Sequence, residues 1–266
     1  MQLPLGIAET WAYRQFILGS VFQELRARYA ESLLGGVWAL VQPLTLIVIY
    51  SVIFSQLMRP GLSGYDQPYA YTVFLCSGLL LWMFFVELLT RNVGIFVENG
   101  GLLKKVQFPR LTLPIIALLA ALLNYAIIML WFGLLLVWAD FFPGIAVMGA
   151  LPVIVIVAGF AVGLGLLGAT VNVYYRDVQH FTGVLTQFWF WLTPIIYPLE
   201  IVPQGYRTFF EWNPILPLVA AMQDIFLRGA WPNWYALAYP AVMSLAALCV
   251  GALVYFRLGQ DMTDEF

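Results

Sequence analysis

Six stretches of the chain contain no Asp, Glu, Lys or Arg, and each is long enough to cross a lipid bilayer as a helix. The apolar core of a bilayer, about 30 Å thick, needs roughly 20 apolar residues of helix. A soluble helix would show a polar face every few residues, which these stretches lack. We therefore predict an all-α polytopic membrane protein with six transmembrane helices, over the ranges Ser32–Met58, Gln67–Val86, Leu111–Ala139, Phe141–Tyr175, Val178–Leu199 and Gly229–Phe256.

The composition supports a membrane protein and limits its domain content. The chain is 62% hydrophobic and only 10% charged, far from the soluble average. With 266 residues, six spans leave little chain for a folded soluble domain, so we expect a single membrane domain. Its expected parts are an interfacial segment (1–31), spans one to five (32–199) with a loop at 91–110, an outer segment (200–228), span six (229–256) and a tail (257–266).

The distribution of basic residues predicts which way the helices cross. An even number of spans puts both termini on one side, and that side then holds nine Lys and Arg residues against three on the other. Cytoplasmic loops carry the excess of positive charge, so we expect both termini in the cytoplasm. The nine are Arg14, Arg26, Arg28, Arg91, Lys104, Lys105, Arg110, Arg176 and Arg257, and the three are Arg59, Arg207 and Arg228.

The segment before the first span, Trp11–Glu31, has the spacing of an amphipathic helix. Apolar residues recur at i, i+4, i+7 and i+11, and polar residues fill much of the rest. The apolar positions are Leu18, Phe22, Leu25 and Tyr29. This pattern predicts a helix in the cytoplasmic interface, either as a plain anchor or as a docking helix for a cytoplasmic partner or a lipid-linked substrate.

The outer segment Glu200–Arg228 is too long for a turn and too apolar for a free loop. Its part Trp212–Gln223 carries no charge and is interrupted by Pro214 and Pro217. Such a piece gives about 18 Å of helix, too short to span. We expect one or two half-helices that re-enter the outer leaflet, covered by protein or by a water-filled cavity. They would form an external gate or a structural plug for the last two spans.

The chain shows no energy source of its own. No Asp, Glu or His lies in the middle of a predicted span, which argues against proton coupling but not against sodium coupling. Neither a Gly-Lys-Ser/Thr loop nor a catalytic or metal-ligand cluster is visible, so we expect no enzymatic activity, cofactor or metal. A separate nucleotide-hydrolysing subunit, docked on the interfacial helix and the basic loop Arg91–Arg110, is the economical hypothesis.

Several short motifs occur in order along most of the chain, and each is weak alone. They are Glu24–Gly35 with Trp38 and Pro43, then Leu103–Val106 and Phe108–Arg110, then Asn172 with Tyr175–Val178, and finally Leu192–Pro198 and Asn213-Pro214. Together they resemble type-2 ABC exporter permeases, most of all those that export O-antigen, capsule or teichoic acid. The Gly100-Gly101 pair departs from the family pattern and would loosen the short helix expected there.

The resemblance implies a bacterial inner-membrane permease with six spans, an N-terminal interface helix, and re-entrant helices between spans five and six. It implies a homodimer of permeases bound to two copies of a cytoplasmic ABC ATPase that carries MgATP, and no nucleic-acid partner. The segment Glu98–Phe108 would be the main coupling helix, and Tyr175–Val178 would lie on a second contact. The expected coupling residues are Glu98, Leu102, Leu103, Lys104, Lys105, Phe108, Arg176 and Asp177, and those of substrate entry are Leu25, Arg26, Arg28 and Tyr29.

Aromatic residues gather around the outer end of the fifth predicted span, and they allow two interpretations. Aromatic rings stack on the apolar faces of sugars, but Trp and Tyr also form interfacial belts in any membrane protein. The candidate channel or gate residues are Trp189, Trp191, Tyr197, Phe209 and Trp212. Consecutive helical residues point about 100° apart, so the run Phe188–Trp191 cannot all face one pore. Gly159, Gly163 and Gly168 in the fourth span indicate close helix packing.

We therefore expect the membrane subunit of an ATP-driven exporter that moves a lipid-linked polysaccharide, most like O-antigen, outward from the cytoplasmic side. ATP binding would close the ATPase dimer, and the coupling helices would transmit this motion to the permease pair. The alternatives are an ABC exporter of a drug or small lipid, an ion-coupled secondary transporter, and a channel or scaffold without an energy source.

Overall fold

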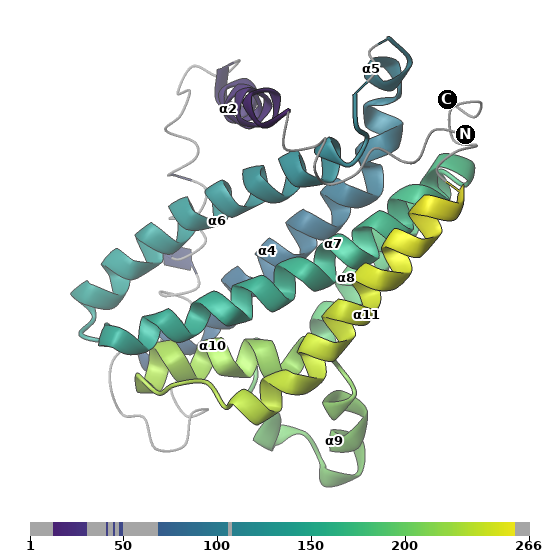
Figure 1. Ribbon diagram of the computed structural model, residues 1–266. Helices are drawn as coiled ribbons and strands as arrows, with labels where there is room; N and C mark the ends of the chain where they lie inside the picture. Colours follow the sequence, from purple (N-terminus) through teal and green to yellow (C-terminus); the bar gives the residue numbers. More distant parts are fainter. Residues whose placement is uncertain are drawn as a thin grey trace.

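The computed structural model describes residues 13–30, 69–105 and 108–258 and the single positions 41, 45, 48 and 49, with the backbone alone at 25–30 and 105. Apart from these single positions, the predicted first span, Ser32–Met58, lies outside the described residues. Every regular element within the described ranges is a helix, as Figure 1 shows, which confirms the predicted all-α class.

Within the described ranges, four helices are long and apolar enough to cross a membrane. They are α4 (Ala70–Glu98), α6 (Thr112–Trp138), α7 (Ala150–Tyr174, preceded by the 3-10 helix η2, Gly144–Gly149) and α11 (Trp234–Leu258). They match the predicted second, third, fourth and sixth spans. Helix α4 is the most deeply buried of the four and packs against α6, α7 and α10. It is therefore the central helix of the bundle.

Helix α4 runs about three turns beyond the predicted end of the second span, Val86. Glu87 and Arg91, the charged residues that follow the predicted end of this span, are paired inside the bundle. The guanidinium of Arg91 lies 3.1 Å from the Glu87 carboxylate, and the other Glu87 oxygen accepts a hydrogen bond of 2.7 Å from Asn124 Nδ2 of α6. The predicted loop at 91–110 is thus wrong in its first part, because residues 91–98 are helical.

The predicted fifth span, Val178–Leu199, contains a shorter helix than expected. Helix α8 (Asp177–Trp191) has 15 residues, about 22 Å of helix, and it ends just before the Leu192-Thr193-Pro194 sequence. Proline removes a backbone donor and disfavours helix at the residue before it. The chain then continues through the short helices η3 (Leu199–Ile201), α9 (Gln204–Glu211) and α10 (Leu216–Arg228).

Glycines allow α7 to pack closely on α11 and α4. A Cβ at Gly163 would overlap the backbone of Ala247 and Leu248 in α11. A Cβ at Gly159 would lie 2.6 Å from Ser244 Oγ, and one at Gly168 would lie 2.8 Å from a Val93 methyl. The close packing predicted for these three glycines is confirmed.

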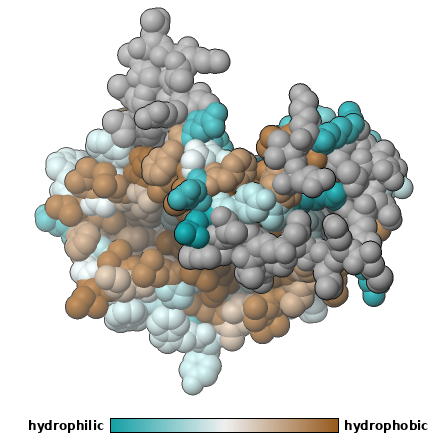
Figure 2. Space-filling model, turned by 45° about the horizontal axis from the view of Figure 1, so that its top comes forward, coloured by the Kyte–Doolittle hydropathy of each residue, from teal (hydrophilic) through white to brown (hydrophobic). Residues whose placement is uncertain are grey.

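The bundle has two distinct ends (Figure 1). At one, which we call the α5 end, α2 (Arg14–Ala30) and α5 (Gly100–Lys105) lie near the end of α4. At the other, the α9 end, lie α9 and α10. Figure 2 shows apolar residues over much of the coloured surface, as expected for helices that contact lipid.

A helix, α2, lies where the N-terminal helix was predicted, and it packs on the bundle through residues outside the predicted apolar face. Ile17 and Val21 are buried against Ile116 and Ala120 of α6. Leu18 and Phe22, the predicted apolar face, stay 52% and 63% exposed.

Candidate functional site

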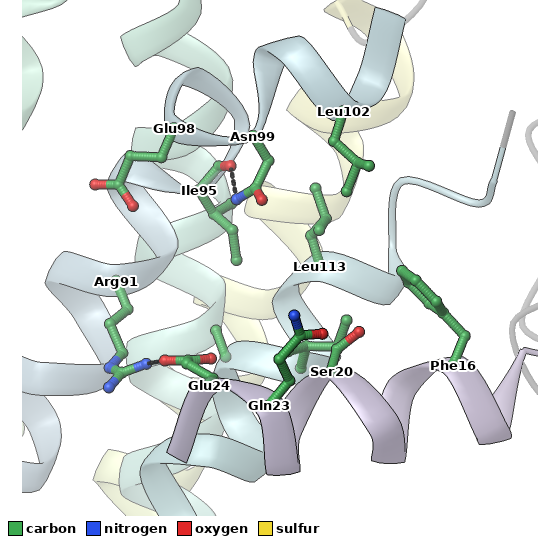
Figure 3. A pocket seen from close by; sticks show the side chains of 12 residues that line it. Phe16, Ser20, Gln23, Glu24, Arg91, Ile95, Glu98, Asn99, Leu102 and Leu113 are labelled. Atoms are coloured by element: carbon green, nitrogen blue, oxygen red, sulfur yellow. Dashed lines mark hydrogen bonds and ion pairs between the residues drawn. The ribbon is translucent and has the colours of Figure 1, made fainter. Parts of the chain in front are cut away.

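Asn99 separates α4 from α5 and fixes how α5 starts. Its side-chain Nδ2 and its backbone N–H both donate to the Ile95 carbonyl, which ends α4. The Asn99 carbonyl then accepts hydrogen bonds of 3.0 Å from the backbone N–H groups of Leu102 and Leu103, which begin α5. Figure 3 shows this junction. The Gly100-Gly101 pair is part of α5 and does not prevent the helix from forming.

The predicted coupling residues at α5 divide into an exposed group and a buried anchor. Glu98, Leu102 and Lys104 are exposed at the α5 end. Phe108 is buried, in a cluster with Ile95, Phe96 and Leu113 against which Leu103 packs, and its ring lies 5.7 Å from that of Phe16 in α2. Phe108 thus anchors α5 to the bundle and to α2, and the side chain of Lys105 lies outside the described residues.

The predicted second contact, the turn between α7 and α8, lies beside the end of α4. Arg176 and Asp177 are exposed in this turn. Two residues on, Gln179 donates a hydrogen bond of 3.3 Å from Nε2 to Glu98 Oε1. Buried Asn172 of α7 accepts 3.2 Å from the Gln179 backbone N–H and donates 3.1 Å to the Val93 carbonyl of α4. The two predicted coupling contacts are therefore joined by hydrogen bonds.

A cavity of about 350 Å³ opens between α2, α4, α5 and α6 at the α5 end. Figure 3 shows that Arg91 from α4 and Glu24 from α2 meet at one side of it, where they form an ion pair. This pair, together with Phe16 on Phe108, fastens α2 to the bundle. The predicted entry residues Leu25, Arg26, Arg28 and Tyr29 belong to the last turns of α2, and their side chains lie outside the described residues.

A second cavity, of about 640 Å³, lies at the α9 end between the start of α4, the segment 194–201 and α10. Its charged lining consists of Glu200, Asp224 and Arg228. Asp224 pairs with Arg228 at 3.1 Å. Burial raises the pKa of the Asp224 carboxyl, the Arg228 charge opposes that rise, and the Glu200 charge adds to it.

The aromatic candidates at the α9 end fall into two groups. Trp189 packs against Trp82, Phe85 and Phe160 inside the bundle. In contrast, Trp191, Phe209 and Trp212 are 63%, 65% and 76% exposed. The Tyr197 hydroxyl donates 2.6 Å to the Trp191 carbonyl, which folds the chain back on the end of α8. Trp189 and Trp191, two positions apart in the run 188–191, therefore lie in different surroundings.

Asn213 holds the break between α8 and α10. Its Oδ1 accepts hydrogen bonds from Trp189 Nε1 at 2.9 Å and from the Ile215 backbone N–H at 3.0 Å. Its Nδ2 donates to Thr193 Oγ1 at 2.8 Å and to the Leu192 carbonyl at 3.2 Å. All four hydrogen-bonding positions of the Asn213 amide are therefore occupied, and every partner lies between Trp189 and Ile215, where the chain passes from α8 to α10.

A family model described as ABC-2 type transporter matches residues 17–227. The chain belongs to the ABC-2 type transporter family. The match runs from α2 into the last turn of α10, so it includes nearly all the elements that build both ends of the bundle. The ABC-2 transporter is thus a multi-pass membrane protein, in agreement with the four apolar helices in the part of the chain that the structure describes.

Curated relatives of this ABC-2 transporter have names that refer to polysaccharide export. An O-antigen export system permease protein RfbA of Myxococcus xanthus is 27% identical over 266 residues, 97% of this chain and 98% of the relative. An RfbA of Klebsiella pneumoniae is 27% identical over 237 residues, 89% of both chains. The polysialic acid transport protein KpsM of Escherichia coli is 25% identical over 236 residues, 88% of this chain and 89% of the relative.

Sequence reasoning did not identify Gln179, Glu24 or Asn124 as partners of the residues it singled out. Gln179 and Glu98 are 81 positions apart, and Arg91 and Glu24 are 67 apart. No local spacing rule relates residues at such separations. Asn172 and Asn213 were singled out as parts of motifs, and the structure adds the hydrogen bonds that they make.

Proposed function

We propose that this ABC-2 transporter is the membrane-spanning subunit of an ATP-driven exporter that moves a lipid-linked polysaccharide out of the bacterial cytoplasm. One observation carries the proposal. The chain aligns over nearly its whole length with permeases named for O-antigen and polysialic acid export. The substrate would be a lipid-linked glycan of the O-antigen kind.

The orientation proposed is with the α5 end in the cytoplasm and the α9 end outside. Lys104, Arg110, Arg176 and Arg257 lie in or next to the helix ends at the α5 end, whereas Arg207 and Arg228 belong to α9 and α10. Positive charge favours the cytoplasmic side, which supports this choice. With a first span over Ser32–Met58, the chain would cross the inner membrane six times and have both termini in the cytoplasm.

The energy source would be a separate ATPase that binds at the α5 end. In this proposal two permeases form a homodimer, two ATPase copies bind beneath it, and MgATP binds to the ATPase alone. The exposed residues Glu98, Leu102 and Lys104 of the α4–α5 junction and Arg176 and Asp177 of the α7–α8 turn would contact it. Their exposure at one end of the bundle supports this role.

Helices α9 and α10 would be the re-entrant pair that forms the exit gate. Exposed Trp191, Phe209 and Trp212 would face the passing glycan, since aromatic faces stack on sugar rings. Trp189 would instead hold the gate in place from inside the bundle, through its hydrogen bond to Asn213.

Deletion of the gene tests the proposal. The expected result is loss of a surface polysaccharide, seen by gel analysis, together with a trapped lipid-linked precursor inside the cell. The wild-type gene should restore export, whereas Lys104→Glu/Lys105→Glu should not, because charge reversal opposes docking at α5. Arg257→Glu, an exposed cation at the end of α11, is the control and should restore export.

Unchanged surface polysaccharide with no trapped precursor would contradict the proposal. That result would favour the exporters of drugs or small lipids.

A further inference from the structure

The end of α4 and the first turn of α8 are joined by one side-chain hydrogen bond. Glu98 is the last residue of α4, directly before the α5 junction, and Gln179 lies in the first turn of α8. Gln179 Nε2 donates to Glu98 Oε1 at 3.3 Å, with both side chains exposed. The bond therefore lies at the surface that the proposed ATPase would contact.

Gly94 makes room for this bond. It lies one helical turn before Glu98, and a Cβ at position 94 would overlap Glu98 Oε1 and come within 3.1 Å of Gln179 Nε2. The two side-chain ends thus rest on the bare backbone of α4. A methyl group there would displace the carboxylate but no backbone atom.

Asn172 holds the backbone of Gln179, one partner of this hydrogen bond, in place. It is 1% exposed and spans α4 and α8, because its Nδ2 donates to the Val93 carbonyl and its Oδ1 accepts from the Gln179 backbone N–H. This fixes the start of α8 one residue away from Gly94. Gln179 is thus held at its backbone by Asn172 and at its side chain by Glu98.

Helix α8 connects this point to the α9 end. Its first turn carries Gln179, and its last turn carries Trp189, which bonds to Asn213 at the start of the α10 segment. A continuous helix of 15 residues therefore runs from the coupling contacts to the candidate gate. A displacement of α5 that reaches Gln179 through Glu98 would reach Asn213 through α8.

We propose that Gln179 is a positioning residue that makes the α4–α5 junction and the α7–α8 turn move as one unit, through the Glu98–Gln179 hydrogen bond formed over Gly94. The inference rests on the proposed function, in which both segments contact the ATPase. Without this bond, the ATPase would still bind α5 and hydrolyse ATP, but less of its motion would reach α8.

The test measures glycan moved per ATP hydrolysed, with the permease and its ATPase reconstituted together in proteoliposomes. Gln179→Glu places two carboxylates against each other, and Gly94→Ala displaces the Glu98 carboxylate. Each should lower the ratio about threefold, the effect of one hydrogen bond of modest strength. Gly183→Ala is the matched control on α8, since a Cβ there meets no atom within 4 Å, and it should keep the wild-type ratio.

A double variant that exchanges the two side chains distinguishes the loss of the hydrogen bond from the change in charge. Glu98→Gln/Gln179→Glu exchanges donor and acceptor, and should restore what Gln179→Glu alone has lost. Thermal unfolding of each variant, expected within the error of wild type, distinguishes a lost link from a damaged fold.

Three results would overturn the inference. They are a wild-type ratio in Gln179→Glu, a wild-type ratio in Gly94→Ala, and failure of the double variant to recover. Failure of the proposed function itself looks different, because the wild-type protein would then move no glycan with the ATPase and the ratio could not be defined.

Discussion

The indole Nε1 of Trp189 donates a hydrogen bond of 2.9 Å to Oδ1 of Asn213, and this bond ties the end of α8 to the segment that starts α10. An indole N–H in an apolar bundle needs an acceptor, and Asn213 supplies it while also holding Thr193. The end of α8 at Trp191 is therefore stabilised by specific hydrogen bonds of Asn213. It explains why the apolar stretch that predicted a fifth span forms only a short helix.

Replacing Asn213 by Ala should destabilise the α9 end. The change leaves the Trp189 N–H and the Ile215 N–H without this acceptor in a buried place. We expect a loss of about 2 kcal/mol in the free energy of unfolding, since unsatisfied buried groups are costly. Denaturant unfolding in detergent measures it. A loss below about 0.5 kcal/mol, the lower limit for a single hydrogen bond, would contradict this account.

Replacing Gly163 by Ala should weaken the packing of α7 on α11. The added methyl would meet the backbone of Ala247 and Leu248, which cannot move aside as a side-chain end can. We expect a loss of about 3 kcal/mol in stability, at the upper end for overpacking. Gly133→Ala in α6 is the control, because its Cβ meets no atom within 4 Å. It should leave stability unchanged or raise it by up to about 1 kcal/mol, since Ala favours helix.

Replacing Arg91 by Ala should loosen α2 without unfolding the bundle. Arg91 is the ion-pair partner of Glu24, and both side chains are partly exposed, so the pair contributes at most about 1 kcal/mol. Hydrogen exchange of the α2 amides should therefore speed up by no more than about fivefold. Arg228→Ala, which removes an ion pair of α10, should leave exchange in α2 unchanged. Equal exchange in both variants would show that α2 does not depend on Arg91.

Asp224 should give the protein a pH-dependent stability at the α9 end. Burial raises its pKa above the ordinary value of 3.8, so the folded chain binds this proton more tightly than the unfolded chain. The stability that comes from this proton is present below pH 3.8 and is lost as the pH rises through the raised pKa. In Asp224→Asn, the decline in melting temperature with rising pH that Asp224 causes should be absent. A pH profile identical to that of the wild type would contradict the assignment of this decline to Asp224.

A matched variant tests the cause of the shift. The Glu200 charge adds to the rise in the pKa of Asp224, so Glu200→Gln should move the decline in stability to lower pH. A profile that stays in place would mean that Glu200 does not act on Asp224.

The four long helices could be predicted because each is a run of apolar residues that lipid or protein must cover. The prediction failed at boundaries, for two physical reasons. Helix α4 continues through Glu87 and Arg91 because those charges find partners in α6 and α2. Helix α8 stops at Trp191 although the following residues are apolar, because the chain there bends through Pro194.

The composition of the candidate sites could be predicted better than their geometry. The motif positions Asn172 and Asn213 proved to be buried and hydrogen-bonded, but nothing local in the sequence shows that they join separate helices. Likewise Phe108 was expected among the coupling residues, and only the fold shows that it is a buried anchor beside Phe16. Contacts of this kind depend on the packing of α4, α6 and α7.

The most direct test of the central claim is ATP-dependent transport by the purified protein. The permease would be reconstituted with its ATPase in proteoliposomes, with lipid-linked polysaccharide on the ATPase side. We predict that the glycan appears on the opposite side only when the ATPase and MgATP are both present. Glycan transport driven by an ion gradient without the ATPase would contradict the account.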